Sequence, residues 1–303
     1  MFFNNIALYN FKESVDYQQE EMEEALTQDL FRKCAPQDFR TFGWANALGK
    51  HGQTLSHFSN GFILLCAKAE EKILPAAAVN EIVQSKVEEV EQKEARRVSR
   101  KERDDIKEST LHQLVQQAFT KSTLTYLFID LKQGYLAVNT TSFSRAENAL
   151  ALLRKSLGTL PVVPAFSNYD LSMYMRNWAM DKAPEKFVFG SEIHLSSPVD
   201  DGVVKSKGYQ PDSEHLTTLF DEGCEVDQLS LSFDERIDFK LSADGMIKRI
   251  TFSDVIKEEN ADIPKEDMAA KLDADFYLGA SEVSILVQSL FTELGEPNVP
   301  QND

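Results

Sequence analysis

Apolar and polar residues alternate in several short runs of the sequence, a pattern typical of β-strands with one buried face. Asn60-Gly61 separates two of these runs, Thr54–Ser59 and Phe62–Lys68. It predicts a hairpin, because Asn-Gly supplies the positive φ angles of a two-residue type I′ turn. Asp244-Gly245 is expected to form the second turn of a meander. Strands are further predicted over Ile6–Phe11, Leu124–Asp130, Tyr135–Thr140, Phe187–Leu195, Leu229–Phe233, Ile237–Leu241 and Met246–Phe252.

Apolar residues spaced three or four apart predict helices in other parts of the chain. A helix between Val15 and Leu30 would be acidic and amphipathic. Ser144 is expected to cap a later helix, with Glu147 completing a capping box and Gly158 following the last turn. Two more helices are predicted, over Leu171–Met180 and Ser281–Leu294.

Residues 76–133 contain neither glycine nor proline, and Pro75 directly precedes them. Two apolar stripes at helical spacing, from Val79 to Val90 and from Leu111 to Phe119, lie on either side of the wholly polar stretch Ser99–Asp105. A single helix over residues 79–118 would be about 60 Å long. The segment therefore either projects as one long arm or folds into a helical pair, and both alternatives remain open from the sequence.

These patterns predict an α+β fold of mixed β-sheets with packed helices. Pro161 and Pro164 indicate a domain boundary near residue 165. We expect a central mixed α/β domain formed by residues 1–75 and 122–165, a projecting helical arm over residues 76–121, and a C-terminal α+β domain over residues 166–303.

Composition narrows the class of protein. The chain has 303 residues and a net charge of −17, which argues against a surface that is basic throughout. Its three cysteines, Cys34, Cys66 and Cys224, are too few and too far apart for a disulfide framework. The sequence has no basic-then-apolar secretion signal and no run of 18 apolar residues. We therefore expect a cytoplasmic protein.

The charge is unevenly distributed. Glu13–Asp29 contains seven acids and no base, and Ser253–Asp303 contains 12 acids and 3 bases. Between Lys93 and Arg103 the balance inverts, with six bases against two acids. Such a field repels anions from most of the surface and accepts them at one place. The alternative is a solvated helix face with internal pairs such as Glu94 with Arg97.

The sequence offers little that indicates catalysis. It contains no P-loop, no G-x-G-x-x-G, no G-x-S-x-G and no C-x-x-C, and its five histidines are scattered. We predict no metal site, no cofactor and no enzymatic activity. Asp273 and Asp275 could lie on one side of a strand, or more simply in a solvated loop. A hydrolase that uses these two aspartates and one of the scattered histidines remains a background possibility.

Several motifs of the chain, in order, resemble the bacterial recombination-associated RdgC family. The resemblance covers essentially all 303 residues, and its specificity lies in the ordered spacing of the motifs. The motifs are Met1–Asn5, Glu70–Pro75, Lys86-Val87, Arg96–Arg103, Ala118-Phe119, Ala146-Glu147, Leu153-Arg154, Leu157–Val162, Gly202–Lys205 with Lys207, Asp244–Arg249, Leu272–Phe276 and Glu293–Glu296.

The resemblance implies a ring-shaped homodimer with two contacts, one between the helical arms and one at the C-terminal domain. It implies binding of double-stranded DNA without sequence preference inside a basic hole, association with the nucleoid, and limited access of the recombinase RecA to DNA. Phe119, with Val115 and Ala118, would lie at the arm contact. The DNA-binding candidates are Arg96, Arg97, Arg100, Lys101 and Arg103, followed by Lys205, Lys207, Lys248 and Arg249.

Two departures from the family pattern bear on the strength of DNA binding. Gln116-Gln117 replaces a Pro-Arg pair that is frequent in relatives, and Gly208-Tyr209-Gln210 replaces a more basic stretch. The alternative function is an acidic protein-binding regulator without DNA affinity, which would imitate DNA or dock on a basic partner. Simple solvation of Lys248 and Arg249 also remains open.

Overall fold

The computed structural model describes residues 3–180, 183–197, 202–208, 214–264 and 266–295. It is a mixed α+β structure built on a large antiparallel sheet. The chain divides into two compact units. The first comprises Met1–Gln28, Asn46–Cys66 and Thr125–Asp303, and the second comprises Asp29–Ala45 and Ala67–Leu124.

The sheet of the first unit has the strand order β4-β5-β6-β1-β12-β11-β10-β8-β9, with β3 paired to β4 and β7 paired to β1. β4 and β5 are long strands that continue into the second unit. The bounds are β1 Ile6–Phe11, β3 Ser56–Ser59, β4 Phe62–Lys72, β5 Thr120–Asp130, β6 Tyr135–Asn139, β7 Val162–Pro164, β8 Phe187–Ser196, β9 Val203–Lys207, β10 Glu225–Phe233, β11 Ile237–Ser242 and β12 Ile247–Phe252.

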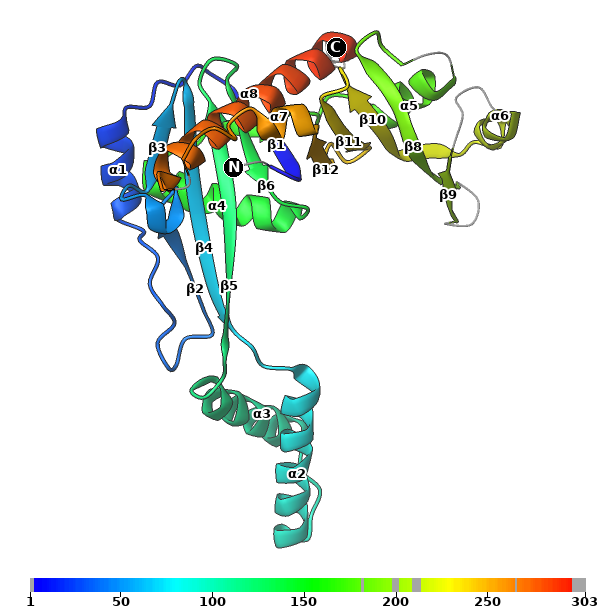
Figure 1. Ribbon diagram of the computed structural model, residues 1–303. Helices are drawn as coiled ribbons and strands as arrows, with labels where there is room; N and C mark the ends of the chain where they lie inside the picture. The colour runs from blue at the N-terminus through cyan, green and yellow to red at the C-terminus, as the bar shows by residue number, and fades with distance from the viewer. Residues whose placement is uncertain (1–2, 181–182, 198–201, 209–213, 265, 296–303) are drawn as a thin grey trace, which may run out of the picture. The chain divides into compact units, whose positions relative to one another are not determined.

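Helices cover both faces of the part of this sheet around β1 (Figure 1). Phe276 and Val283 of α8 belong to one core with Leu8 and Phe128. On the opposite face the Tyr9 hydroxyl donates to Glu147 of α4 at 2.9 Å. The helices are α1 Gln19–Thr27, α4 Phe143–Leu157, α5 Leu171–Met180, α6 Glu214–Asp221, α7 Asp254–Glu258 and α8 Met268–Leu294, with a 3₁₀ turn η1 Gly49–His51. None of the helices in the described ranges is long and apolar enough to cross a membrane.

The second unit contains β2 Arg40–Ala45, the adjoining halves of β4 and β5, and two helices. These are α2 Ala76–Glu94 and α3 Arg100–Val115, and α3 packs against α2 (Figure 1). Val79, Val83 and Val87 form their buried contact. The segment after Pro75 is therefore a helical pair, and α2 ends where Ala95 adopts a left-handed φ of 50°.

Both predicted Gly-containing turns are confirmed. Asn60 and Gly61 have φ angles of 50° and 93° between β3 and β4, and Gly245 has a φ of 83° between β11 and β12. The seven other predicted strands agree with β1, β5, β6, β8, β10, β11 and β12 to within a few residues.

Three predictions about helix ends are wrong. α8 begins at Met268, capped by the Asp267 side chain, so Asp273 and Asp275 lie in a helix. The cap of α4 is Ser142, whose hydroxyl accepts from the N–H of Arg145, and Ser144 is already inside the helix. The acidic helix α1 is shorter than the predicted range, because only Gln19–Thr27 are helical.

Candidate nucleic-acid interface

The most basic segment of the sequence forms the connection between α2 and α3 together with the first turn of α3. We call Arg96–Arg103 the basic turn. Ser99 caps α3 by accepting from the N–H of Glu102 at 3.3 Å, and Glu102 accepts from the N–H of Ser99 at 2.8 Å. This reciprocal capping box satisfies two backbone donors at the start of α3. Val98, in between, packs against the valines of α2 and anchors the turn.

Arg96 is committed to intramolecular ion pairs. Its guanidinium donates to Glu94 at 2.7 Å and to both carboxylate oxygens of Glu102 at 2.6 and 3.0 Å. The hydrogen bond with Glu102 and the charges of Glu102 and Glu94 raise the pKa of Arg96. The structure thus gives Arg96 a role in holding the turn, and its charge is already compensated.

The other predicted cations of the turn are exposed. Arg97, Arg100 and Lys101 have no carboxylate partner within the described part of the chain. Arg103 donates only to the neutral amide of Gln84, at 3.0 Å. Four cations within seven residues make a surface that can neutralise phosphates without reading bases.

Two further candidates lie on the C-terminal strands of the sheet. Lys205 of β9 pairs in register with His194 of β8, and Lys248 of β12 pairs with Lys240 of β11. Cross-strand partners and positions two apart along a strand lie on the same side of a sheet. His194 is the register partner of Gln228 in β10, and Lys240 is the register partner of Ser230. Gln228 and Ser230 are two residues apart, so the side chains of both pairs lie on one face of the sheet.

This face, which we call the lysine face, is partly charge-compensated. Lys205 is exposed, whereas Lys240 is buried against Glu192 and Lys248 is paired with Asp244 at 3.2 Å. Partial burial and the charges of Lys240 and Lys205 lower the pKa of His194. The sequence analysis missed His194 and Lys240. The alternation of polar and apolar residues along β10 and β11 could have indicated them, because it places Lys240 on the polar side.

The remaining basic candidates are placed differently. Arg249 is exposed and has a left-handed φ of 53° within β12. Lys207 is the last residue of β9, opposite Glu192 in register, and its side chain lies outside the described set. Of the two family departures, Gln116 is an exposed residue at the end of α3, and Tyr209-Gln210 falls outside the described ranges.

The three predicted interface residues separate into surface and core. Phe119 is 84% exposed, and Ala118 is half-buried. Val115, the last residue of α3, is completely buried and has no surface to offer a partner. The carbonyl of Phe119 accepts from the N–H of Ile73, itself 48% exposed, at 2.8 Å, so two apolar side chains come from adjacent backbone positions.

The carboxylates considered for hydrolysis do not lie together on one face. Oδ1 of Asp273 lies 2.7 Å from Nε2 of His57 in β3, and Asp275 accepts from Asn260 at 3.2 Å. Positions two apart point to different sides of a helix. Within the described ranges, no three His, Cys, Asp or Glu side chains are grouped so that they could hold a metal ion.

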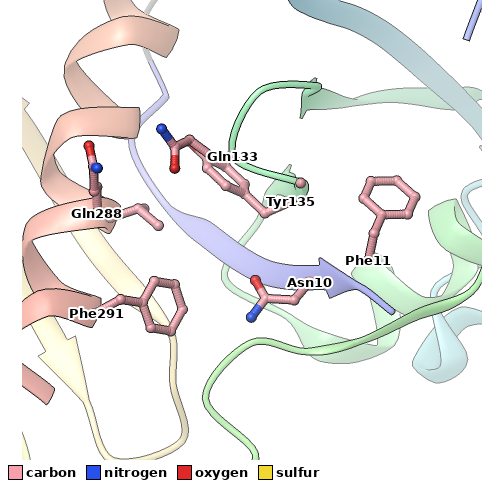
Figure 2. A pocket seen from close by; sticks show the side chains of 8 residues that line it. Asn10, Phe11, Gln133, Tyr135, Gln288 and Phe291 are labelled. Carbon is pink, nitrogen blue, oxygen red and sulfur yellow. The ribbon is translucent and has the colours of Figure 1, made fainter. Parts of the chain in front are cut away.

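One pocket of the first unit is lined by amides and not by cations. It has a volume of about 240 Å³ and lies between the end of β1, the β5–β6 turn and α8. Figure 2 shows the side chains of Asn10, Gln133 and Gln288 around it, together with Phe291. Because it contains no cation, it is a poor site for phosphate and does not extend the basic surfaces.

Comparison with known proteins shows the family of this chain. A family model described as "Putative exonuclease, RdgC" matches residues 1–297. The chain is 51% identical over 298 residues to the recombination-associated protein RdgC of Pseudoalteromonas translucida, covering 98% of each chain. It is 37% identical over 297 residues to the protein of that name from Yersinia enterocolitica, covering 97% of this chain and 98% of the relative. The chain therefore belongs to the RdgC family of recombination-associated proteins.

Proposed function

We propose that this protein binds double-stranded DNA without sequence preference, as a ring-shaped homodimer, and that it limits the access of the recombinase RecA to DNA. It would act in the cytoplasm, on the nucleoid, without a catalytic step. The single observation that carries DNA binding is the basic turn, where Arg97, Arg100, Lys101 and Arg103 are exposed and have no carboxylate partner among the residues that the structure describes.

The contrast with the rest of the chain supports this proposal. A chain with a net charge of −17 repels DNA from most of its surface. In such a chain, exposed cations without a carboxylate partner attract the phosphates of DNA locally. The lysine face offers a second surface, chiefly through Lys205, and the contacts there would also go to phosphates.

Phe119 supports the dimer. A phenylalanine that is 84% exposed beside the half-exposed Ile73 leaves apolar surface in water, and a second copy of the chain would cover it. We propose that residues 76–121, which contain the helical pair, make one dimer contact through Phe119 and that residues 166–303 make the second. Val115, which is buried, then supports the contact from beneath the surface.

The experiment is binding to a labelled DNA duplex over a series of salt concentrations, with light scattering on the free protein. We expect a dimer whose affinity falls steeply with salt, because cations that contact phosphate release counterions. Comparison of linear with closed circular DNA then tests the ring. Absence of binding at low salt would overturn the proposal and favour an acidic protein-binding regulator, which would leave DNA unbound.

The printed family description also names an exonuclease, so the same samples test for strand degradation. Incubation of end-labelled duplex with the protein and Mg²⁺ or Mn²⁺ should leave the DNA intact under the proposed function. Shortened strands that disappear in an Asp273→Asn variant would revive the hydrolase interpretation.

A further inference from the structure

Arg249 adopts a backbone conformation that an arginine rarely takes. The register shift between β11 and β12 places Arg249 and Ile250 opposite the single residue Phe239, which is a β-bulge. Arg249 has a φ of 53° in this bulge, the left-handed region in which glycine is the usual residue. The other left-handed non-glycine residues of the described chain lie in turns or at a helix end, so only Arg249 has this conformation within a strand.

The bulge turns the backbone of Arg249 toward the start of the chain. Its N–H donates to the Asn5 side-chain Oδ1 at 3.0 Å, and the next N–H, that of Ile250, donates to the Asn4 carbonyl at 2.7 Å. Bulges of this kind commonly re-aim a side chain at a functional site. Here Arg249 lines a hollow of about 540 Å³; its other lining residues are Asn4, Asn5, Ile250, Thr251, Phe252 and Lys257.

The polar groups of this hollow favour an anion. Since Asn5 Oδ1 accepts from Arg249, its Nδ2 group remains a donor. Lys257 is paired with Asp254 at 3.2 Å, whereas Arg249 has no carboxylate partner among the described residues. Thr251 adds a hydroxyl, which lies 3.4 Å from the Arg249 carbonyl. A guanidinium with neighbouring amide and hydroxyl groups matches the oxygens of a phosphate group.

We propose that the hollow at the Arg249 bulge is a binding site for one phosphate group, held by the guanidinium of Arg249 and the amide of Asn5. The phosphate can belong to the backbone of DNA or to a free mononucleotide, and the chemistry of recognition is the same. The DNA source rests on the proposed function, whereas the mononucleotide source is independent of it.

Titration of the full-length protein with inorganic phosphate and with AMP tests the site, followed through the side-chain Nε–H signal of Arg249 and the Nδ2 signals of Asn5. Both sets of signals should shift with saturation, and sodium chloride at equal ionic strength should leave them in place. Arg249→Gly should abolish saturable binding while keeping the fold, because glycine suits the left-handed conformation. Arg249→Lys should retain weaker binding, and Arg145→Ala, which removes an exposed arginine of α4, should bind as the parent does.

The two sources are separated by duplex binding. If Arg249→Gly weakens duplex binding and reduces the salt slope by about one, the phosphate is that of DNA. If duplex binding is unchanged and AMP binding is lost, the ligand is a mononucleotide. Equal shifts with chloride, or saturable phosphate binding that survives in Arg249→Gly, would overturn the site even where the parent binds DNA. A parent that binds AMP but no DNA would instead overturn the proposed function and leave the site standing.

Discussion

Arg96 grips the carboxylate of Glu102 with two nitrogens, Nη2–Oε1 at 2.6 Å and Nη1–Oε2 at 3.0 Å. The same carboxylate accepts from the N–H of Ser99 and closes the capping box of α3. One side chain thus fixes the end of the turn and the start of the helix together. The exposed cations Arg97 and Arg100 lie between these two residues in the sequence. Their backbone is held in place by the ion pair and the cap, which lowers the conformational entropy lost when they bind a phosphate.

Acid should loosen this turn before it unfolds the rest of the chain. The hydrogen bond from Arg96 and then those with Ser99 lower the pKa of Glu102 to about 2. Because the pKa in the folded chain lies below the ordinary value, the contact stabilises the turn fully at neutral pH and is lost as pH falls from the ordinary glutamate range toward about 2. Hydrogen exchange of the Ser99 and Glu102 amides measures this loss. Glu102→Gln should show the loosened turn already at neutral pH, and amide protection that stays constant down to about pH 2 would contradict the assignment.

Neighbouring arginines of the turn should differ in their effect on DNA. Arg97→Ala removes an uncompensated charge, so it should weaken duplex binding and lower the salt slope by about one. Arg96→Ala removes a charge already paired with Glu94 and Glu102, so its effect on the slope should be smaller and its effect on exchange at Ser99 larger. The two variants have the same change in net charge, so a difference between them cannot come from the overall field. Equal slopes would argue against direct contact by Arg97.

Substitutions at Phe119 and Val115 should have different effects, the first on dimer formation and the second on the free energy of unfolding. Phe119→Ala removes a side chain that is 84% exposed, so we expect little change in unfolding free energy and a shift from dimer to monomer in light scattering. Val115→Ala removes buried methyl groups and should cost about 2 kcal/mol in denaturant unfolding. A Phe119→Ala variant that remains dimeric at the lowest measurable concentration would remove Phe119 from the interface.

The sequence predicts the fold well where one pair of residues determines the backbone conformation of a turn. Asn60-Gly61 defined a hairpin because few other residues accept two positive φ angles in succession. Helix starts were harder, since Ser142 and Ser144 both suit a cap, and only the structure shows that the Ser142 hydroxyl accepts from the N–H of Arg145. α8 was predicted 13 residues too short, because its first turns carry Asp273 and Asp275 among apolar residues and read as a loop.

The position of the candidate site could be predicted from the charges in the sequence, but the ion-pair partners of its residues could not. The basic run indicated the position of Arg96 and Arg97, yet only the fold shows that Glu102 compensates the first and not the second. The lysine face depends on register across β8 to β12, which brings together residues 54 positions apart such as His194 and Lys248. No local pattern contains such pairings. The bulge at Arg249 could not be predicted from the sequence either, because arginine rarely adopts a left-handed φ.

Breaking the buried ion pair between the β10–β11 turn and α8 should be one of the more destabilising single changes in the first unit. Arg236 donates to both oxygens of Glu282, at 3.0 and 2.5 Å, and Glu282 is only 5% exposed. Arg236→Ala would leave a buried carboxylate uncompensated, so we expect a loss of about 3 kcal/mol, at the low end for broken buried pairs because Arg236 itself is partly exposed. Urea unfolding measures this loss.

The double variant Arg236→Met with Glu282→Leu is the control, since it removes both charges and keeps apolar volume; it should recover most of the stability lost by Arg236→Ala. Duplex binding should be unchanged in the double variant, because neither residue is a DNA-binding candidate. A double variant as unstable as Arg236→Ala would show that side-chain packing, and not the lone charge, accounts for the loss.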